Sequence, residues 1–170
     1  QPVRFEHCSL RQGLSQGSGY TITQDRDGYI WMGTQHGLNR FDGYQVSIFY
    51  QGKNGYRGSN HINSLLTDSA GNVWIASTGG LSVLEYKTRR FFTASEFTQV
   101  KSNLDSINIV RIWQDPQKQL WALSFSNGIY RLQPTIQTGK LSWQIARYME
   151  QGPSSPVDIT ADKSGTVYLA

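Results

Sequence analysis

One motif recurs four times along this chain and decides what kind of fold it can adopt. Its aspartates are 43, 47 and 47 residues apart, at Asp25, Asp68, Asp115 and Asp162. An aromatic residue follows each aspartate by six positions: Trp31, Trp74, Trp121 and Tyr168. An aliphatic residue precedes each by three: Ile22, Leu65, Ile112 and Ile159. A fixed period of this length indicates a series of similar small units that stack on one another.

Each unit has the pattern of an antiparallel meander. A strand ends near the aspartate, and the following tight turn places a glycine three positions later, at Gly28, Gly71 and Gly165, with Lys118 in the third copy. The chain then returns as an aliphatic and aromatic strand, turns again at a second glycine and continues into a third strand. In the first copy these two strands are predicted over 29–33 and 38–41. A fourth, outer strand is predicted over 45–50, with equivalents around 90–92 and 141–146. No helical periodicity competes, so the predicted fold class is all-β.

Four strands in a unit of this size are typical of a β-propeller blade, in which radial stacking buries both faces of every sheet. A β-solenoid is less favoured, because its coils are shorter and the alternating turns indicate antiparallel pairing. We predict one propeller segment over 1–170, with repeats at about 15–58, 59–102, 103–152 and an incomplete 153–170. The repeated tryptophan is expected to be a buried wedge between neighbouring blades.

The incomplete fourth copy leads to a further expectation. Its unpaired edge and apolar face should be covered by further blades of a longer protein or by self-association, as in a dimer. A four-bladed ring closed by a strand over 3–10 is the alternative.

Composition and motifs argue against several function classes. The chain has 16 Lys and Arg, 12 Asp and Glu, a net charge of +4 and a pI of about 9.3. The densest basic cluster, 87–90, is interpreted as a solvated outer rim, so nucleic-acid binding is not predicted. The single cysteine, Cys8, excludes an internal disulfide. No stretch approaches the ~18 apolar residues of a membrane span, and no signal peptide is recognisable. The 170 residues are therefore expected to be soluble.

The sequence also has no recognisable catalytic or cofactor-binding motif. Asp25, Asp27 and Gly28 superficially suggest a calcium loop, but a turn-forming aspartate that accepts backbone N–H groups is favoured. The three histidines have no metal-ligand spacing. No nucleophile elbow, phosphate-binding loop or dinucleotide fingerprint occurs. We predict no metal, no cofactor and no catalytic residue.

Three stretches together resemble a known family. Gly13-Leu14-Ser15-Gln16 is followed by Gln24-Asp25-Arg26-Asp27-Gly28-Tyr29-Ile30-Trp31-Met32-Gly33-Thr34 and by Gly37-Leu38-Asn39-Arg40-Phe41-Asp42-Gly43-Tyr44. They are similar to the two-component regulator propeller repeats. The similarity is strongest over 13–44, good over 65–84 and weaker over 112–132, where the turn glycine is lost.

This resemblance implies a context for the chain. It implies the N-terminal part of a seven-bladed propeller in the periplasmic sensor region of a bacterial inner-membrane receptor. It also implies a cytoplasmic output domain outside these residues, a histidine kinase, often a hybrid one, or a diguanylate cyclase. The segment itself would then be non-catalytic.

Propeller topology predicts where a ligand would bind. The aspartate turns all lie on one face, and the turns between second and third strands lie on the opposite face with the connections between blades. On that opposite face we predict ligand-binding residues whose aromatic and amide groups suit a sugar-like ligand: Gln35, His36, Asn54, Tyr56, Arg57, Asn60, His61, Phe125 and Asn127. Thr78 and Ser126 are placed beside them. The competing interpretation is that these are ordinary polar loop residues.

Three functional hypotheses remain from the sequence. The first is a ligand-sensing propeller that passes a signal to an output domain elsewhere, with an oligosaccharide or another small periplasmic molecule as ligand. The second is a propeller-based carbohydrate hydrolase or lyase. The third is an architectural module that mediates dimerisation.

Overall fold

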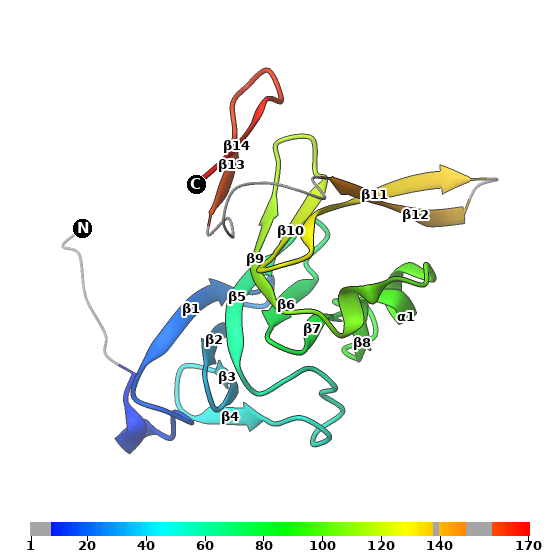
Figure 1. Cartoon of the computed structure of the whole chain (residues 1–170). Coiled ribbons are helices and arrows are strands. Elements are labelled where there is room, and N and C mark those ends of the chain that lie inside the picture. The colour runs from blue at the N-terminus through cyan, green and yellow to red at the C-terminus, as the bar shows by residue number, and fades with distance from the viewer. Residues whose placement is uncertain (1–7, 138–139, 149–157) are drawn as a thin grey trace, which may run out of the picture.

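The structure is a computed structural model of the chain and describes residues 8–137, 140–148 and 158–170. It contains three four-stranded antiparallel sheets and a two-stranded hairpin (Figure 1). The first sheet consists of β1 (Gly19–Gln24), β2 (Ile30–Thr34), β3 (Gly37–Phe41) and β4 (Val46–Phe49). The second consists of β5 (Ile62–Thr67), β6 (Val73–Ser77), β7 (Gly80–Leu84) and β8 (Phe91–Thr93). The third consists of β9 (Ile109–Gln114), β10 (Leu120–Ser124), β11 (Gly128–Gln137) and β12 (Lys140–Tyr148). The hairpin consists of β13 (Ile159–Ala161) and β14 (Val167–Leu169).

The strands of each sheet follow one another in chain order, which confirms the all-β prediction of four-stranded propeller meanders. The inner strand β5 lies beside the inner strands β1 and β9 of the neighbouring sheets (Figure 1). The predicted outer strands are present as β4, β8 and β12. The last of these is longer than predicted, because its pairing with β11 continues from Ile129 opposite Tyr148 to Gln137 opposite Lys140.

Side-chain hydrogen bonds tie the inner strands to one another. The Thr21 hydroxyl accepts the Leu65 N–H at 2.9 Å, and the hydroxyls of Thr23 and Thr67 are 3.0 Å apart. The amide of Asn63 in β5 donates to the Ile109 carbonyl in β9 at 2.8 Å. These bonds fix each sheet relative to the next, so the loops at the strand ends have defined neighbours.

The repeated aspartate holds both its turn and its tryptophan. One carboxylate oxygen of Asp25 accepts the N–H groups of Asp27 and Tyr29, each at 3.0 Å, and the other accepts the indole N–H of Trp31 at 2.8 Å. The indoles of Trp74 and Trp121 donate to their own repeat aspartates at 2.8 and 2.9 Å. The turn role was predicted, whereas the bond to the indole was not. Because a buried N–H group needs an acceptor, this bond gives a physical reason for the constant spacing of six.

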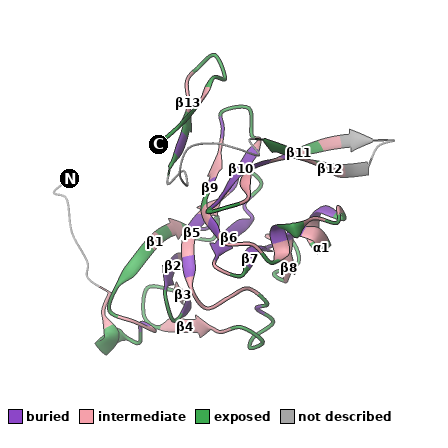
Figure 2. Cartoon of the chain, viewed as in Figure 1, coloured by how far each residue is buried: buried purple, intermediate pink, exposed green. Residues whose placement is uncertain are grey.

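The tryptophans form the core between the sheets, as predicted. Their exposed fractions are 1% for Trp31, 0% for Trp74 and 8% for Trp121. Trp74 packs with Ile112 of the next sheet, and Trp31 packs with Leu65. Figure 2 shows the buried residues gathered in the middle strands, where β6 and β10 are buried along their whole length.

Three short helical segments were not predicted: η1 (Leu10–Gln12), α1 (Ala94–Thr98) and η2 (Asn103–Asp105). In the α-helix, Thr93 caps the N-terminus by accepting the Glu96 N–H, and Glu96 accepts the Thr93 N–H at 2.9 Å. A five-residue helix is too short to show a helical period in the sequence. Within the described residues, no helix is long and apolar enough to cross a membrane.

The third repeat keeps the same aspartate turn although it lacks the glycine. Gly28 and Gly71 have φ of 91°, and Lys118 occupies their place with φ of 64°. A residue with a Cβ loses about 1–2 kcal/mol in this left-handed region, and glycine loses about 0.5–1 kcal/mol more chain entropy on folding than alanine. Lys118→Gly should therefore raise the free energy of unfolding by about 0.5–1 kcal/mol in urea denaturation. Lys163→Gly, at an exposed turn position without positive φ, is the control and should not stabilise the chain. A stability gain in both variants, or in neither, would contradict the strain at Lys118.

Candidate functional site

Two of the predicted site residues meet on the face opposite the aspartate turns. The ring of His61, just before β5, stacks on Tyr20 of β1 with centroids 6.1 Å apart and planes inclined by 23°. The side-chain amide of Gln35, in the turn between β2 and β3, donates to the Tyr20 hydroxyl. Its backbone N–H donates to the Gln16 side chain at 3.1 Å. The group formed by Tyr20, Gln35 and His61 therefore joins the first two sheets and is called the tyrosine cluster below.

The tyrosine cluster combines a stacking surface with hydrogen-bonding groups. Tyr20 is 52% exposed, Gln35 is exposed and His61 is half-buried. His36 is also exposed, and its N–H donates to the Thr34 hydroxyl at 3.0 Å, which fixes the turn. Aromatic faces, an amide and an imidazole in one place can stack on the apolar face of a sugar ring and exchange hydrogen bonds with its hydroxyls.

Tyr20 is not among the site residues predicted from the sequence, because those were all placed in turns and in connections between strands. The available signal was an aromatic residue next to Gly19 in a strand whose alternate positions, Thr21 and Thr23, face the second sheet. Strict alternation would place Tyr20 on the opposite face, but the pairing of β1 with β2 is irregular between Gly19 and Thr21, and the Tyr20 ring stacks on His61 of the second sheet. This signal alone would therefore not have placed Tyr20 in the site.

Tyr56 corrects the prediction of a ligand-binding role at this position. Its side chain is fully buried in the core with Trp31 and Ile62, and its hydroxyl donates to the Ser59 carbonyl at 2.9 Å. Burial raises the pKa of this hydroxyl well above its ordinary value. The Tyr56 side chain therefore stabilises the connection between the first two sheets and offers no surface to a ligand.

The other predicted residues of this connection lie apart from the tyrosine cluster. Arg57 is exposed and forms an ion pair with Glu96 of α1. The Asn60 side chain accepts the Gln51 N–H at 2.7 Å and so closes the connection on itself. Asn54 donates to the Ile48 carbonyl at 3.2 Å and lines a cavity between the first two sheets.

The residues predicted on the third sheet surround the turn between β10 and β11. Phe125 is 53% exposed, and its N–H donates to the Asn108 carbonyl at 3.1 Å. The Asn127 side chain donates to the Ser126 hydroxyl at 3.1 Å, and the backbone carbonyl of Asn127 accepts a hydrogen bond from the Arg147 Nε at 2.7 Å. On the second sheet, the hydroxyls of Thr78 and Ser59 are 3.0 Å apart.

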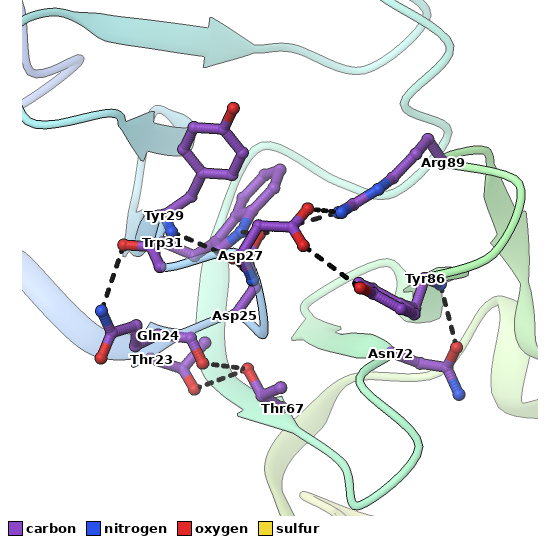
Figure 3. Close-up of polar contacts among 11 residues, drawn as sticks. Thr23, Gln24, Asp25, Asp27, Tyr29, Trp31, Thr67, Asn72, Tyr86 and Arg89 are labelled. Carbon is purple, nitrogen blue, oxygen red and sulfur yellow. Dashed lines mark hydrogen bonds and ion pairs between the residues drawn. The ribbon is translucent and has the colours of Figure 1, made fainter.

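A second polar group lies on the face of the aspartate turns (Figure 3). Arg89 forms an ion pair with Asp27, and its guanidinium lies 3.9 Å from the Asp25 carboxylate. The Tyr86 hydroxyl donates to Asp27 at 3.2 Å, and the Tyr86 N–H donates to the Asn72 side chain at 3.0 Å. Residues 87–90 are exposed, as the interpretation of a solvated rim implies, but Arg89 also links the first two sheets through Asp27, which was not predicted.

Among the residues that the structure describes, no three His, Cys, Asp or Glu side chains are grouped so that they could hold a metal ion.

Part of this chain is similar in sequence to known proteins. The model of the "Two component regulator propeller" family matches residues 13–36 and 56–79. "Histidine kinase P4" of Formosa agariphila is 44% identical over 45 residues, which are 26% of this chain and 3% of that protein.

Two solved structures share the fold over most of the chain. The extracellular domain of the putative hybrid two-component system BT3049 from B. thetaiotaomicron has a TM-score of 0.76 and 25% identity, covering 96% of this chain and 23% of that one. The corresponding domain of BT4673 from the same organism has a TM-score of 0.66 and 22% identity, covering 89% of this chain and 22% of that one.

The chain thus spans less than a quarter of the solved domains and a small fraction of the matched kinase. Each matched stretch, 13–36 and 56–79, contains the aspartate turn and the tryptophan strand of one sheet, the first and the second respectively. Two copies of the two-component regulator propeller repeat are thus matched in this chain, and its fold is similar to that of the extracellular domain of a putative hybrid two-component system.

Proposed function

We propose that this chain is a ligand-sensing part of the periplasmic region of a bacterial membrane-bound receptor. In this proposal the chain is not catalytic and transmits ligand binding to a kinase or cyclase output domain outside these residues. The similarity to extracellular domains of hybrid two-component systems and to a histidine kinase supports this role. Signal would pass by a rigid-body or oligomeric rearrangement that ligand binding favours.

The observation that carries the proposal is the tyrosine cluster. An exposed aromatic stack with an amide at its edge is a common way to hold a sugar, because the ring faces bury C–H groups while the amide bonds hydroxyls. The three residues come from two sheets, so a ligand held there would contact both. We therefore propose an oligosaccharide as the ligand.

The test is a thermal-shift screen of the chain against a panel of neutral and acidic oligosaccharides, with chromatography of the products. We expect at least one oligosaccharide to raise the melting temperature without being cleaved. Tyr20→Ala should abolish the shift, whereas Tyr44→Ala, which removes a tyrosine that is 96% exposed, should leave it unchanged. Cleavage products would favour the hydrolase or lyase instead. A panel without any shift would favour the architectural module.

A further inference from the structure

A cavity of about 310 Å³ lies between the first and second sheets, apart from the tyrosine cluster. Tyr29, Trp31 and Phe49 line it from the first sheet and its strand ends, and Phe91 lines it from the second. Cavities that hold small organic molecules start at about this size. Asp27 and Arg89, the ion pair drawn in Figure 3, also line this cavity.

The aromatic lining is fixed by its own packing. The rings of Trp31 and Phe49 are 5.5 Å apart, and those of Phe49 and Phe91 are 5.4 Å apart at an angle of 61°. Phe91 also meets Trp31 edge-on, with centroids 6.5 Å apart and planes at 84°. Rings held in this way offer a flat molecule an apolar surface that needs little rearrangement.

Arg40 gives this lining a positive charge. Its guanidinium carbon lies 4.7 Å from the centre of the Tyr29 ring and 5.9 Å from the centres of Trp31 and Phe49. Its Nε is buried and has no hydrogen-bond partner, and the guanidinium makes no ion pair with another described residue. By contrast, Arg89 is already paired with Asp27. The cavity therefore carries one arginine that has no ion-pair partner among the described residues. Asp42 is close enough to feel its charge: hydrogen bonds from the Gln45 and Tyr44 N–H groups, and to a smaller extent Arg40, lower the pKa of that carboxyl.

We propose that this cavity binds a small organic monoanion, a carboxylate with a flat apolar body. The carboxylate would accept hydrogen bonds from Arg40, and the flat body would lie against the rings of Tyr29, Phe49 and Phe91. A single negative charge matches the single cavity arginine that has no ion-pair partner among the described residues. A dianion such as a phosphate monoester is disfavoured, because the Asp27 carboxylate lines the same cavity. A neutral ligand would leave Arg40 without an ion-pair partner.

The third sheet provides a matched comparison within the chain. Arg131 stands at the position equivalent to Arg40, lies 5.9 Å from the ring centre of Trp121 and 5.2 Å from that of Tyr148, and also has a buried Nε without a hydrogen-bond partner. Stacking of an arginine on the repeat tryptophan is thus a recurrent structural feature. Arg40 differs because it lines the cavity between the sheets, and Arg131 is not part of that lining.

The test uses the intact chain with benzoate as probe, benzamide as its neutral counterpart and phenyl phosphate as its dianionic counterpart, in calorimetric titrations. We expect benzoate to bind at least about tenfold more tightly than either counterpart, a difference of about 1.4 kcal/mol. Arg40→Gln should weaken benzoate binding at least about tenfold, whereas Arg131→Gln and Tyr20→Ala should change it by less than about twofold. Because Tyr20→Ala removes the tyrosine cluster alone, this site can fail or succeed independently of the proposed function.

A second measurement needs no variant. The indoles of Trp31 and Trp121 donate to equivalent aspartates, so their N–H resonances are matched reporters. Benzoate should shift the Trp31 resonance and leave that of Trp121 in place. Equal affinity for benzoate and benzamide, equal weakening by the two arginine variants, or equal shifts at the two indoles would each overturn the proposal.

Discussion

Trp74→Ala is expected to lower the free energy of unfolding by about 3–5 kcal/mol, the usual cost of truncating a buried aromatic residue. The Trp74 side chain is 0% exposed and meets Phe97 and Trp143 edge-on, with ring centroids 5.5 and 5.9 Å away. Its removal also takes one donor from the buried Asp68 carboxylate. Urea denaturation, with the m-value compared between variants, measures the change.

The control for this prediction must be an exposed cation without an ion pair. Arg89 does not qualify, because it is paired with Asp27. Arg90 is exposed and belongs to none of the ion pairs among the described residues, so Arg90→Ala should change stability by less than about 0.5 kcal/mol. Equal denaturation midpoints for the two variants, with unchanged m-values, would show that Trp74 is not part of the core.

Trp74→Phe tests how much of the cost of Trp74→Ala comes from the buried ring and how much from the hydrogen bond to Asp68. It keeps a six-membered ring but removes the N–H donor to Asp68 and the five-membered part of the indole, so it should cost about 1–3 kcal/mol, less than the alanine variant. The Asp68 carboxylate keeps the hydrogen bond from the Asn72 side chain. A loss as large as that of the alanine variant would show that the hydrogen bond, and not the buried ring, dominates.

The repeat was sufficient to predict the sheets, because their determinants are local. The aspartate, the turn and the tryptophan of each copy lie within six residues of each other. The turn persists in the third copy because the left-handed strain of Lys118 is small beside the hydrogen bonds that Asp115 accepts from Gln119 and Trp121.

The candidate site was less predictable, because its contacts join residues far apart in the sequence. Topology placed Gln35 and His61 on one face, but the residue that connects them, Tyr20, belongs to a strand. Tyr56 lies in a glycine-rich connection that resembles an exposed loop, yet it packs in the core. The ion pair of Arg89 could not be predicted for the same reason, because its partner Asp27 comes from the previous repeat.

Among the described residues, the packing rule of the repeat is not satisfied on the exposed face of β1, nor at Tyr168 of the fourth repeat, which is 53% exposed. Leu65, Ile112 and Ile159 occupy equivalent positions and pack in the clusters that hold Trp31, Trp74 and Trp121 of the preceding sheet. Ile22 occupies the same position and is 67% exposed. We therefore expect Ile22 to be covered by a further sheet that carries a tryptophan of the same repeat.

The test compares the effect of Ile22→Ala on stability in the 170-residue chain and in a longer protein that carries further repeats. In the 170-residue chain, Ile22→Ala should change the free energy of unfolding by less than about 0.5 kcal/mol, as exposed positions do. In a longer protein that carries further repeats it should cost about 2–5 kcal/mol, the range for a buried isoleucine. Leu65→Ala is the matched control and should cost about 2–5 kcal/mol in both, because Leu65 is already 7% exposed in this chain. Sedimentation of the shorter chain completes the test, since an uncovered apolar face should cause association that rises with concentration. A monomer at all concentrations, together with an Ile22→Ala cost that does not depend on length, would show that no further sheet packs on β1.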